Sequence, residues 1–168
     1  MIKRIIRTAA PDDRHILTEL KTAYIRSLYR GYIPSERLKA LNPTPYDTHI
    51  ADFLVTPGQQ VLLCEEEERP LGYLAIGEDP QDARCGMIFD AASAPAADEA
   101  VRDALVVEAA SRLAEKGKER IYVWLLRDNF QARFRFERLN FKLEGSLRTY
   151  EIEGSEAQLI RYVYRIAK

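Results

Sequence analysis

Gly86-Met-Ile-Phe-Asp-Ala-Ala-Ser93 runs almost directly into Pro95-Ala-Ala-Asp-Glu-Ala-Val-Arg-Asp-Ala-Leu105. These two stretches predict a strand, a turn and a long helix, which ends before Gly117 because glycine suits the left-handed position after a helix. Proline is common in a first helical turn, so we expect the helix to begin near Pro95. No glycine occurs between Gly86 and Gly117. The turn and the first helical residues offer three acids instead: Asp98, Glu99 and Asp103.

Around this stretch the chain alternates strands and helices, with no linker, repeat or low-complexity segment. Further strands are predicted at about 1–8, 60–65, 71–77, 120–126, 141–153 and 159–166, and further helices at about 11–28, 35–41, 49–55 and 129–139. A charged hairpin turn (66–70) and a polar loop (78–84) separate the three central strands. We therefore expect one α/β domain over residues 1–168, with a mixed, mostly antiparallel sheet of about six to seven strands and about four flanking helices.

The overall composition excludes some classes of function. Hydrophobic residues make up 46% of the chain and charged residues 30%, as in an ordinary globular domain. A net charge of −1 argues against a general nucleic-acid binder, which needs an excess of positive charge. The segment from Met1 to Thr8 lacks the continuous apolar stretch of a signal peptide, and no run approaches membrane-spanning length. We therefore expect a cytoplasmic protein with no membrane or nucleic-acid partner.

No metal site is predicted. His15 and His49, the two histidines, have no metal-like partner three or four residues away. The four consecutive glutamates of 65–68 are expected to be solvated residues of a hairpin turn. Cys64 and Cys85 lie in apolar surroundings without ligand spacing, so we expect buried free thiols.

Several phrases, in this order, resemble the GNAT superfamily of acyl-CoA-dependent N-acetyltransferases. They are Ile5-Ile-Arg-Thr-Ala-Ala-Pro-Asp-Asp13, Ala23-Tyr-Ile-Arg-Ser-Leu-Tyr-Arg-Gly-Tyr-Ile-Pro34, Val61-Leu-Leu-Cys-Glu65 with Leu71-Gly-Tyr-Leu-Ala-Ile-Gly77, and Glu119-Arg-Ile-Tyr-Val-Trp-Leu-Leu-Arg-Asp-Asn129 followed by Ala132-Arg-Phe-Arg-Phe-Glu-Arg-Leu-Asn-Phe141. The last segment resembles the family pattern N-x-x-A-x-x-F-Y-E-x-x-G-F. The resemblance covers nearly the whole chain.

The resemblance implies an acetyl-CoA site between the fourth and fifth strands, which a bulge separates. In the family a glycine-containing loop, R/Q-x-x-G-x-G/A, binds the cofactor diphosphate at the following helix, where free N–H groups attract anions. An amine then attacks the thioester, a base accepts its proton, and a tyrosine often protonates the leaving thiolate. Carried over to this sequence, the residues placed at the cofactor are Ala92, Ser93, Arg102, Asn129 and Phe136. Tyr24, Tyr29 and Tyr32 would form an aromatic wall around a small-molecule or peptide amine, or would only pack at the sheet edge.

The sequence departs from the family pattern at three places. The phosphate loop falls within 96–103 and contains no glycine, so Asp98 and Glu99 either repel the phosphates or cap the helix themselves. Phe136 replaces the tyrosine that protonates the thiolate, so no catalytic residue can be carried over there. Met87 stands where a carboxylate is often found, and Asp90, expected to point to the opposite face from Met87, is a weak substitute. Asn129 is a candidate for the cofactor site and equally for a helix N-cap.

Two functions therefore remain open at the sequence level. One is an N-acetyltransferase with a divergent cofactor loop, which predicts an open cleft between the fourth and fifth strands with free N–H groups at the next helix. The other is an inactive module of the same fold that no longer uses acetyl-CoA, which predicts a helix capped by Asp98 or Glu99 and a cleft filled by Phe136. A homodimer is also possible, since three tyrosines of the last two strands are expected at a dimer interface or in the cleft: Tyr150, Tyr162 and Tyr164.

Overall fold

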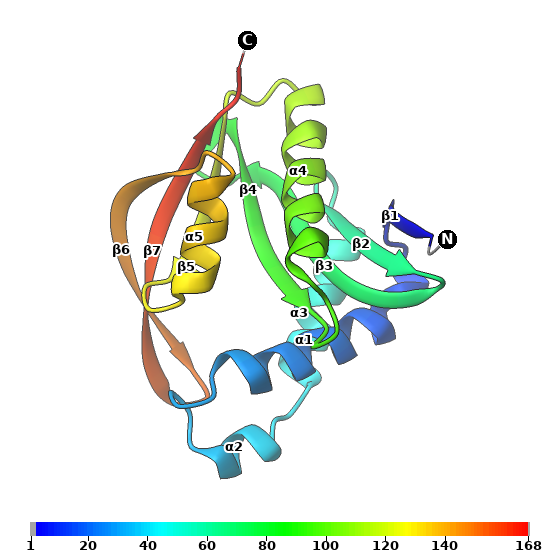
Figure 1. The fold of residues 1–168 in the computed structure, drawn as a ribbon, viewed down its shortest axis with the longest axis vertical. Helices are drawn as coiled ribbons and strands as arrows, with labels where there is room; N and C mark the ends of the chain where they lie inside the picture. The colour runs from blue at the N-terminus through cyan, green and yellow to red at the C-terminus, as the bar shows by residue number, and fades with distance from the viewer. Residues whose placement is uncertain (1–2, 168) are drawn as a thin grey trace.

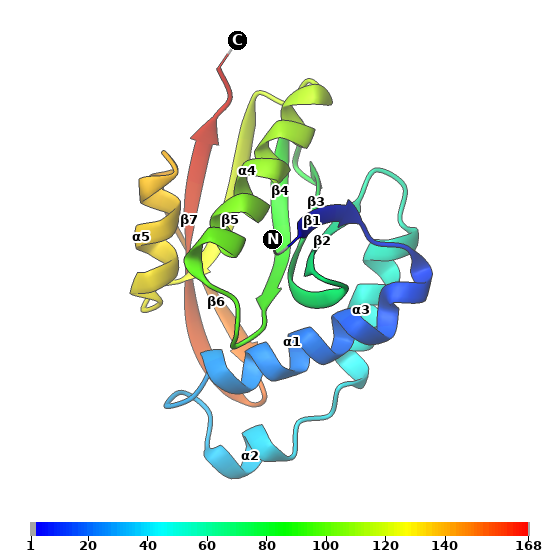
Figure 2. The same ribbon diagram turned by 45° about the vertical axis from the view of Figure 1, so that its right-hand side comes forward.

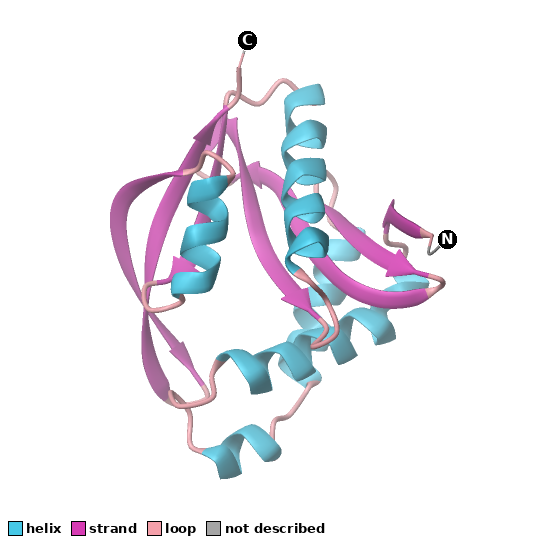
Figure 3. Cartoon of the chain, viewed as in Figure 1, coloured by secondary structure: helices cyan, strands magenta, loops and turns pink. Residues whose placement is uncertain are grey.

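The computed structural model describes residues 3–167, which form one seven-stranded sheet with helices on both faces (Figure 1). The strands are β1 (Arg4–Thr8), β2 (Gln60–Glu66), β3 (Arg69–Asp79), β4 (Asp82–Ser93), β5 (Arg120–Leu126), β6 (Lys142–Ile152) and β7 (Ser155–Arg165). The helices are α1 (Arg14–Leu28), α2 (Ser35–Lys39), α3 (Thr44–Val55), α4 (Glu99–Glu115) and α5 (Phe130–Arg138), and a short 3-10 helix spans Pro11–Asp13. The predicted α/β class and the order of elements are confirmed, with five α-helices in place of about four (Figure 3).

The sheet has the order β1-β2-β3-β4-β5-β7-β6, and within the described residues β4 and β5 are its one parallel pair. α4 and α5 lie on one face, where they share a hydrophobic core with the central strands (Figure 2). α1 and α3 cover the other face of β2, β3 and β4. No helix of the described residues is long and apolar enough to cross a membrane.

α4 packs closely against β4 because Gly86 has no side chain. A Cβ atom added at Gly86 would lie 2.8 Å from both Cδ atoms of Leu113, which is itself buried. Gly86 pairs with Ile121 in the parallel β4–β5 ladder. The helix is therefore seated directly over the segment where these two strands are still hydrogen-bonded.

Several predicted boundaries were wrong: α3 begins at Thr44 and not at His49, and β7 begins at Ser155 and not at Leu159. Two further differences have a clear physical cause. α4 begins at Glu99 and not near Pro95, because the Asp98 side chain caps the helix and Ala97 N–H already closes a separate turn on the Ala94 carbonyl (3.0 Å). The polar loop expected at 78–84 is also much shorter. Its outer residues continue β3 and β4, leaving a tight turn in which Asp79 accepts a hydrogen bond from the backbone N–H of Gln81 (2.8 Å).

A β-bulge at Phe89 changes which way the end of β4 faces. Asp90 lies opposite Ala75, whereas Ile88 lies opposite Ile76, so Phe89 is an extra residue in β4. One extra residue shifts the strand's alternation by one position. The expectation that Asp90 and Met87 point to opposite faces is therefore wrong: Asp90 faces the α1 side of the sheet, as Met87 does.

Tyr162 belongs to the core, so the prediction of an interface or cleft role for it is wrong, whereas Tyr164 is partly buried at the edge of the same core and does not line the cavity described below. Tyr162 is fully buried; its hydroxyl donates to Glu137 Oε1 (2.7 Å) and accepts from Arg133 Nε (2.9 Å), which ties α5 to β7. Tyr164 packs against the Phe141 ring at 5.2 Å between centroids. Tyr150, in contrast, is exposed.

Candidate functional site

The parallel pair β4–β5 separates halfway along its length. The two strands pair from Cys85–Arg120 to Ile88–Val123, and in the part of the chain that the structure describes no pairing joins them beyond that point. β4 continues along β3 to Ser93, and β5 continues along β7 to Leu126. A cavity of about 480 Å³ lies where the strands diverge. The facing edges of the diverging segments, 89–93 and 124–126, thus keep backbone groups available for a ligand.

All eight residues predicted for the site line this cavity. They are Ala92, Ser93, Arg102, Asn129 and Phe136 from the predicted cofactor set and Tyr24, Tyr29 and Tyr32 from the predicted acceptor set. The topology explains this convergence, because α4 and α5 start from the carboxyl ends of the two diverging strands, where ligands of open α/β sheets commonly bind. Tyr24 approaches the same space from α1, on the other face of the sheet, and Tyr29 and Tyr32 approach it from the turn after this helix.

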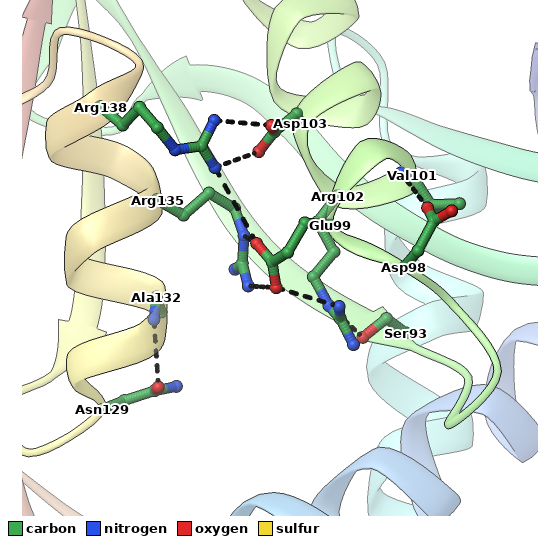
Figure 4. Close-up of polar contacts among 10 residues, drawn as sticks. All are labelled: Ser93, Asp98, Glu99, Val101, Arg102, Asp103, Asn129, Ala132, Arg135 and Arg138. Atoms are coloured by element: carbon green, nitrogen blue, oxygen red, sulfur yellow. Dashed lines mark hydrogen bonds and ion pairs between the residues drawn. The ribbon is translucent and has the colours of Figure 1, made fainter.

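The N-terminus of α4 is capped by the protein itself. Asp98 is the N-cap, and its Oδ1 accepts a hydrogen bond from the backbone N–H of Val101 (3.0 Å). Figure 4 shows the Asp98 side chain folded back on the first turn of α4, away from α5. Of the two roles left open for Asp98, repelling the phosphates or capping the helix, the structure shows the cap.

Replacing Asp98 by Ala removes this cap. We expect the free energy of unfolding to fall by about 1 kcal/mol, the usual cost of losing an N-cap oxygen. Asp98→Asn is the matched control, because asparagine caps about as well as aspartate and should leave the stability nearly unchanged. Urea denaturation followed by circular dichroism measures both. Equal losses for the two variants would mean that the charge of Asp98, and not its cap, stabilises the helix.

Glu99, one residue further, points across to α5 (Figure 4). Arg135 forms two hydrogen bonds with its carboxylate, at 3.0 and 3.1 Å, and Arg102 a third at 3.2 Å. The guanidinium of Arg135 lowers the pKa of Glu99. A second bridge lies one helical turn on, where Arg138 binds both oxygens of Asp103 (2.7 and 3.0 Å). Acids and arginines therefore meet across the space between the two helices, above the diverging strands.

Asn129 and Phe136 line the cavity but have structural partners. Asn129 is the N-cap of α5, accepting from the backbone N–H of Ala132 (3.2 Å). Phe136 is only 5% exposed and packs edge-to-face on Phe141, with ring centroids 4.9 Å apart. Phe136 therefore lines the cavity without filling it.

A polar cluster that the sequence analysis did not identify lies on the α1 side of the cavity. The Asp90 carboxylate accepts hydrogen bonds from Lys21 Nζ (2.5 Å) and from the Tyr73 hydroxyl (2.7 Å). All three residues line the cavity, and burial raises the pKa of Tyr73 well above its usual value, so its proton stays in place. No sequence pattern indicates that side chains of α1, β3 and β4 meet here, because the bulge at Phe89 is what turns Asp90 toward Lys21.

The three tyrosines of the predicted acceptor set lie beside this cluster. Tyr29 is 5% exposed, and burial raises the pKa of its hydroxyl, whereas Tyr32 is 42% exposed. Their rings meet edge-to-face with centroids 6.4 Å apart. The Lys21 ammonium lies over the Tyr24 ring, with Nζ 5.8 Å from the ring centroid. Trp124, which the sequence analysis also missed, lines the cavity from β5.

No protein-family model matches the chain, and no curated protein sequence matches it significantly. Solved structures do match over nearly the full length of both chains. An acetyltransferase of the GNAT family from Streptococcus pneumoniae is 18% identical, with a TM-score of 0.69 over 98% of this chain and 100% of that one. The PaiA N-acetyltransferase from Thermoplasma acidophilum in complex with coenzyme A is 16% identical, with a TM-score of 0.73 over 98% and 99%. The ribosomal-protein-S18-alanine N-acetyltransferase from Escherichia coli is 11% identical, with a TM-score of 0.74 over 99% and 96%. At these identities the comparison shows the fold, and it is the GNAT fold that the sequence phrases predicted.

Proposed function

We propose that this chain, which has the GNAT fold, is an acyl-CoA-dependent N-acyltransferase. In this proposal an acetyl group passes from acetyl-CoA to the primary amine of a small molecule or peptide. The observation that supports it best is the separation of β4 and β5 around a cavity of about 480 Å³, since the two separated strand edges leave room between them for the extended arm of acetyl-CoA. The solved structures that share the fold include a chain in complex with coenzyme A.

The cavity fits one part of acetyl-CoA better than another. The pantetheine arm carries amide groups. These groups can hydrogen-bond to the open backbone edges of 89–93 and 124–126 in the way that an added β-strand would. The diphosphate fits the α4 N-terminus poorly, because Asp98 already caps it and its loop has no glycine to let the phosphates approach the backbone. Arg102 and Arg135 line the cavity and supply positive charge near this end. The cofactor therefore fits the site if side chains bind its diphosphate.

The α1 side of the cavity supplies groups suited to an amine. Asp90 accepts the proton that the attacking amine must lose, and Lys21 and Tyr73 hold its carboxylate in place. The exposed ring of Tyr32 and the ring of Tyr24 give the amine an aromatic wall that attracts cations. Phe136 has no hydroxyl, so it supplies no proton to the leaving group.

A second candidate function is a binding or regulatory module of the same fold that no longer uses acyl-CoA. It is favoured by one specific observation: the protein's own acids cap α4 and bridge α4 to α5, where the family binds a diphosphate. Under this proposal the cavity binds a ligand without phosphates, or none.

Calorimetric titration of the full chain with acetyl-CoA at moderate salt separates the two candidates. We expect binding in the micromolar range, with coenzyme A competing for the same site. Thiol release in the presence of a panel of primary amines then tests for transfer. The absence of heat and of competition up to millimolar acetyl-CoA would contradict the transferase proposal and favour the module.

A further inference from the structure

Two arginines at the helix end of the cavity are bound by one carboxylate of the same chain. Arg102 and Arg135 line the cavity, from α4 and α5 respectively, and both contact Glu99. We call Arg102 and Arg135 the cleft arginines. Their side chains are 26% and 12% exposed, so they are packed in place by the helices and are not free surface residues.

The geometry at Glu99 is that of an anion site. Its two carboxylate oxygens receive three hydrogen bonds from the cleft arginines, at 3.0, 3.1 and 3.2 Å, and the contact with Arg135 is bidentate. Arg102 is also oriented from its other side, by a hydrogen bond from its Nε to Ser93 Oγ (3.2 Å) at the end of β4. Planar guanidinium groups bind phosphate oxygens in the same way as they bind carboxylates. Glu99 thus occupies a position where a phosphate would find the same partners.

Glu99 is also the most displaceable member of this set. Its side chain is 56% exposed, against 12% for Arg135. Ion pairs of exposed carboxylates are weak, because water competes with both partners. A diphosphate brings more negative charge than one carboxylate and can engage both arginines at once. At the N-terminus of α4, Asp98 already accepts from the backbone N–H of Val101, and its negative charge repels an anion there.

We propose that the cleft arginines form a side-chain site for the diphosphate of a nucleotide-type cofactor, and that Glu99 is an internal anion which occupies this site until the diphosphate displaces it. This proposal rests on the proposed function for the identity of the cofactor. It replaces the family's backbone cradle with guanidinium groups, and it makes Glu99 the residue that limits affinity. Glu99 then swings toward solvent, where its side chain is already half exposed.

The test compares two variants that remove one negative charge from adjacent residues. Glu99→Gln frees the cleft arginines, whereas Asp98→Asn removes the same charge from the same helix end, keeps the cap, and contacts neither cleft arginine. We expect coenzyme A to bind Glu99→Gln about tenfold more tightly than the unchanged protein, and Asp98→Asn to differ by about twofold or less. Arg135→Gln should weaken binding about tenfold. Thermal denaturation of each variant shows that it is folded.

Two smaller probes separate this proposal from the proposed function. Inorganic pyrophosphate should show the same order of affinities across the variants, while pantetheine, which has no phosphate, should bind all of them equally. Tighter pyrophosphate binding to Glu99→Gln without any pantetheine binding would support the anion site and contradict the transferase. Equal affinities of Glu99→Gln and the unchanged protein for both coenzyme A and pyrophosphate would overturn the anion site, as would the absence of pyrophosphate binding to every variant.

Discussion

Replacing Asp90 by Asn is expected to slow acyl transfer by about 100-fold or more, the usual contribution of a positioned proton acceptor. Asparagine keeps the shape of the side chain but cannot accept the amine proton. It also leaves the Lys21 ammonium, whose side chain is only 15% exposed, without its carboxylate. Because that pair is mostly buried, we expect the free energy of unfolding to fall as well, by about 2 kcal/mol. Affinity for acetyl-CoA should change little, since Asp90 lies on the α1 side of the cavity.

The measurements are thiol release from acetyl-CoA with a panel of primary amines, urea denaturation, and calorimetric titration with acetyl-CoA. Asp82→Asn is the matched control on the same strand, because Asp82 pairs with the exposed Arg84 (3.1 Å) and lies outside the cavity. The neighbouring Arg84 lowers the pKa of Asp82 to about 2, yet an exposed pair of this kind contributes little to stability. Transfer at the unchanged rate in Asp90→Asn would remove Asp90 from the mechanism.

The second large effect is expected at the contact between α4 and β4. Leu113→Ala should lower the free energy of unfolding by about 3 kcal/mol, because Leu113 is 1% exposed and its loss leaves a cavity against the sheet. Gly86→Ala should also destabilise the protein, by about 1 to 2 kcal/mol, since the added methyl group meets Leu113 at 2.8 Å.

The double variant provides the control for this pair. Shortening Leu113 opens space for the methyl group at Gly86. The double variant should therefore lose about 1 kcal/mol less free energy of unfolding than the sum of the losses of the two single variants. Urea denaturation of the four proteins gives the coupling. Additive losses would mean that α4 does not rest on Gly86 in the way the structure shows.

Most of the fold could be predicted from the sequence because its signals are local. The apolar run of Arg120–Leu126, the alternation of 159–166 and the uninterrupted helix before Gly117 each determine their own element. The order of these elements is then compatible with only a few sheet topologies. Element boundaries that depend on side-chain hydrogen bonds were harder to predict. The start of α4 depended on Asp98 capping the helix, and the length of β3 and β4 depended on the turn that Asp79 stabilises.

The candidate site was predicted only where it follows from position along the chain. Ala92, Ser93 and Asn129 lie at the ends of strands that diverge, so the topology alone brings them to the cavity. The Lys21–Asp90–Tyr73 cluster could not be predicted in this way, because one inserted residue in β4 decides which face Asp90 presents. The bridges between α4 and α5 depend likewise on the packing of two helices that are separated by a strand in sequence.

Amide hydrogen exchange of the full chain, with and without saturating acetyl-CoA, tests the central claim most directly. The claim is that a ligand completes the open edges of β4 and β5. New backbone hydrogen bonds slow exchange where they form, so peptides covering 89–93 and 124–126 should exchange more slowly with acetyl-CoA present. Peptides from β6, which lies at the far edge of the sheet, should be unaffected. Unchanged exchange in both strand segments, or protection confined to other parts of the chain, would contradict the account.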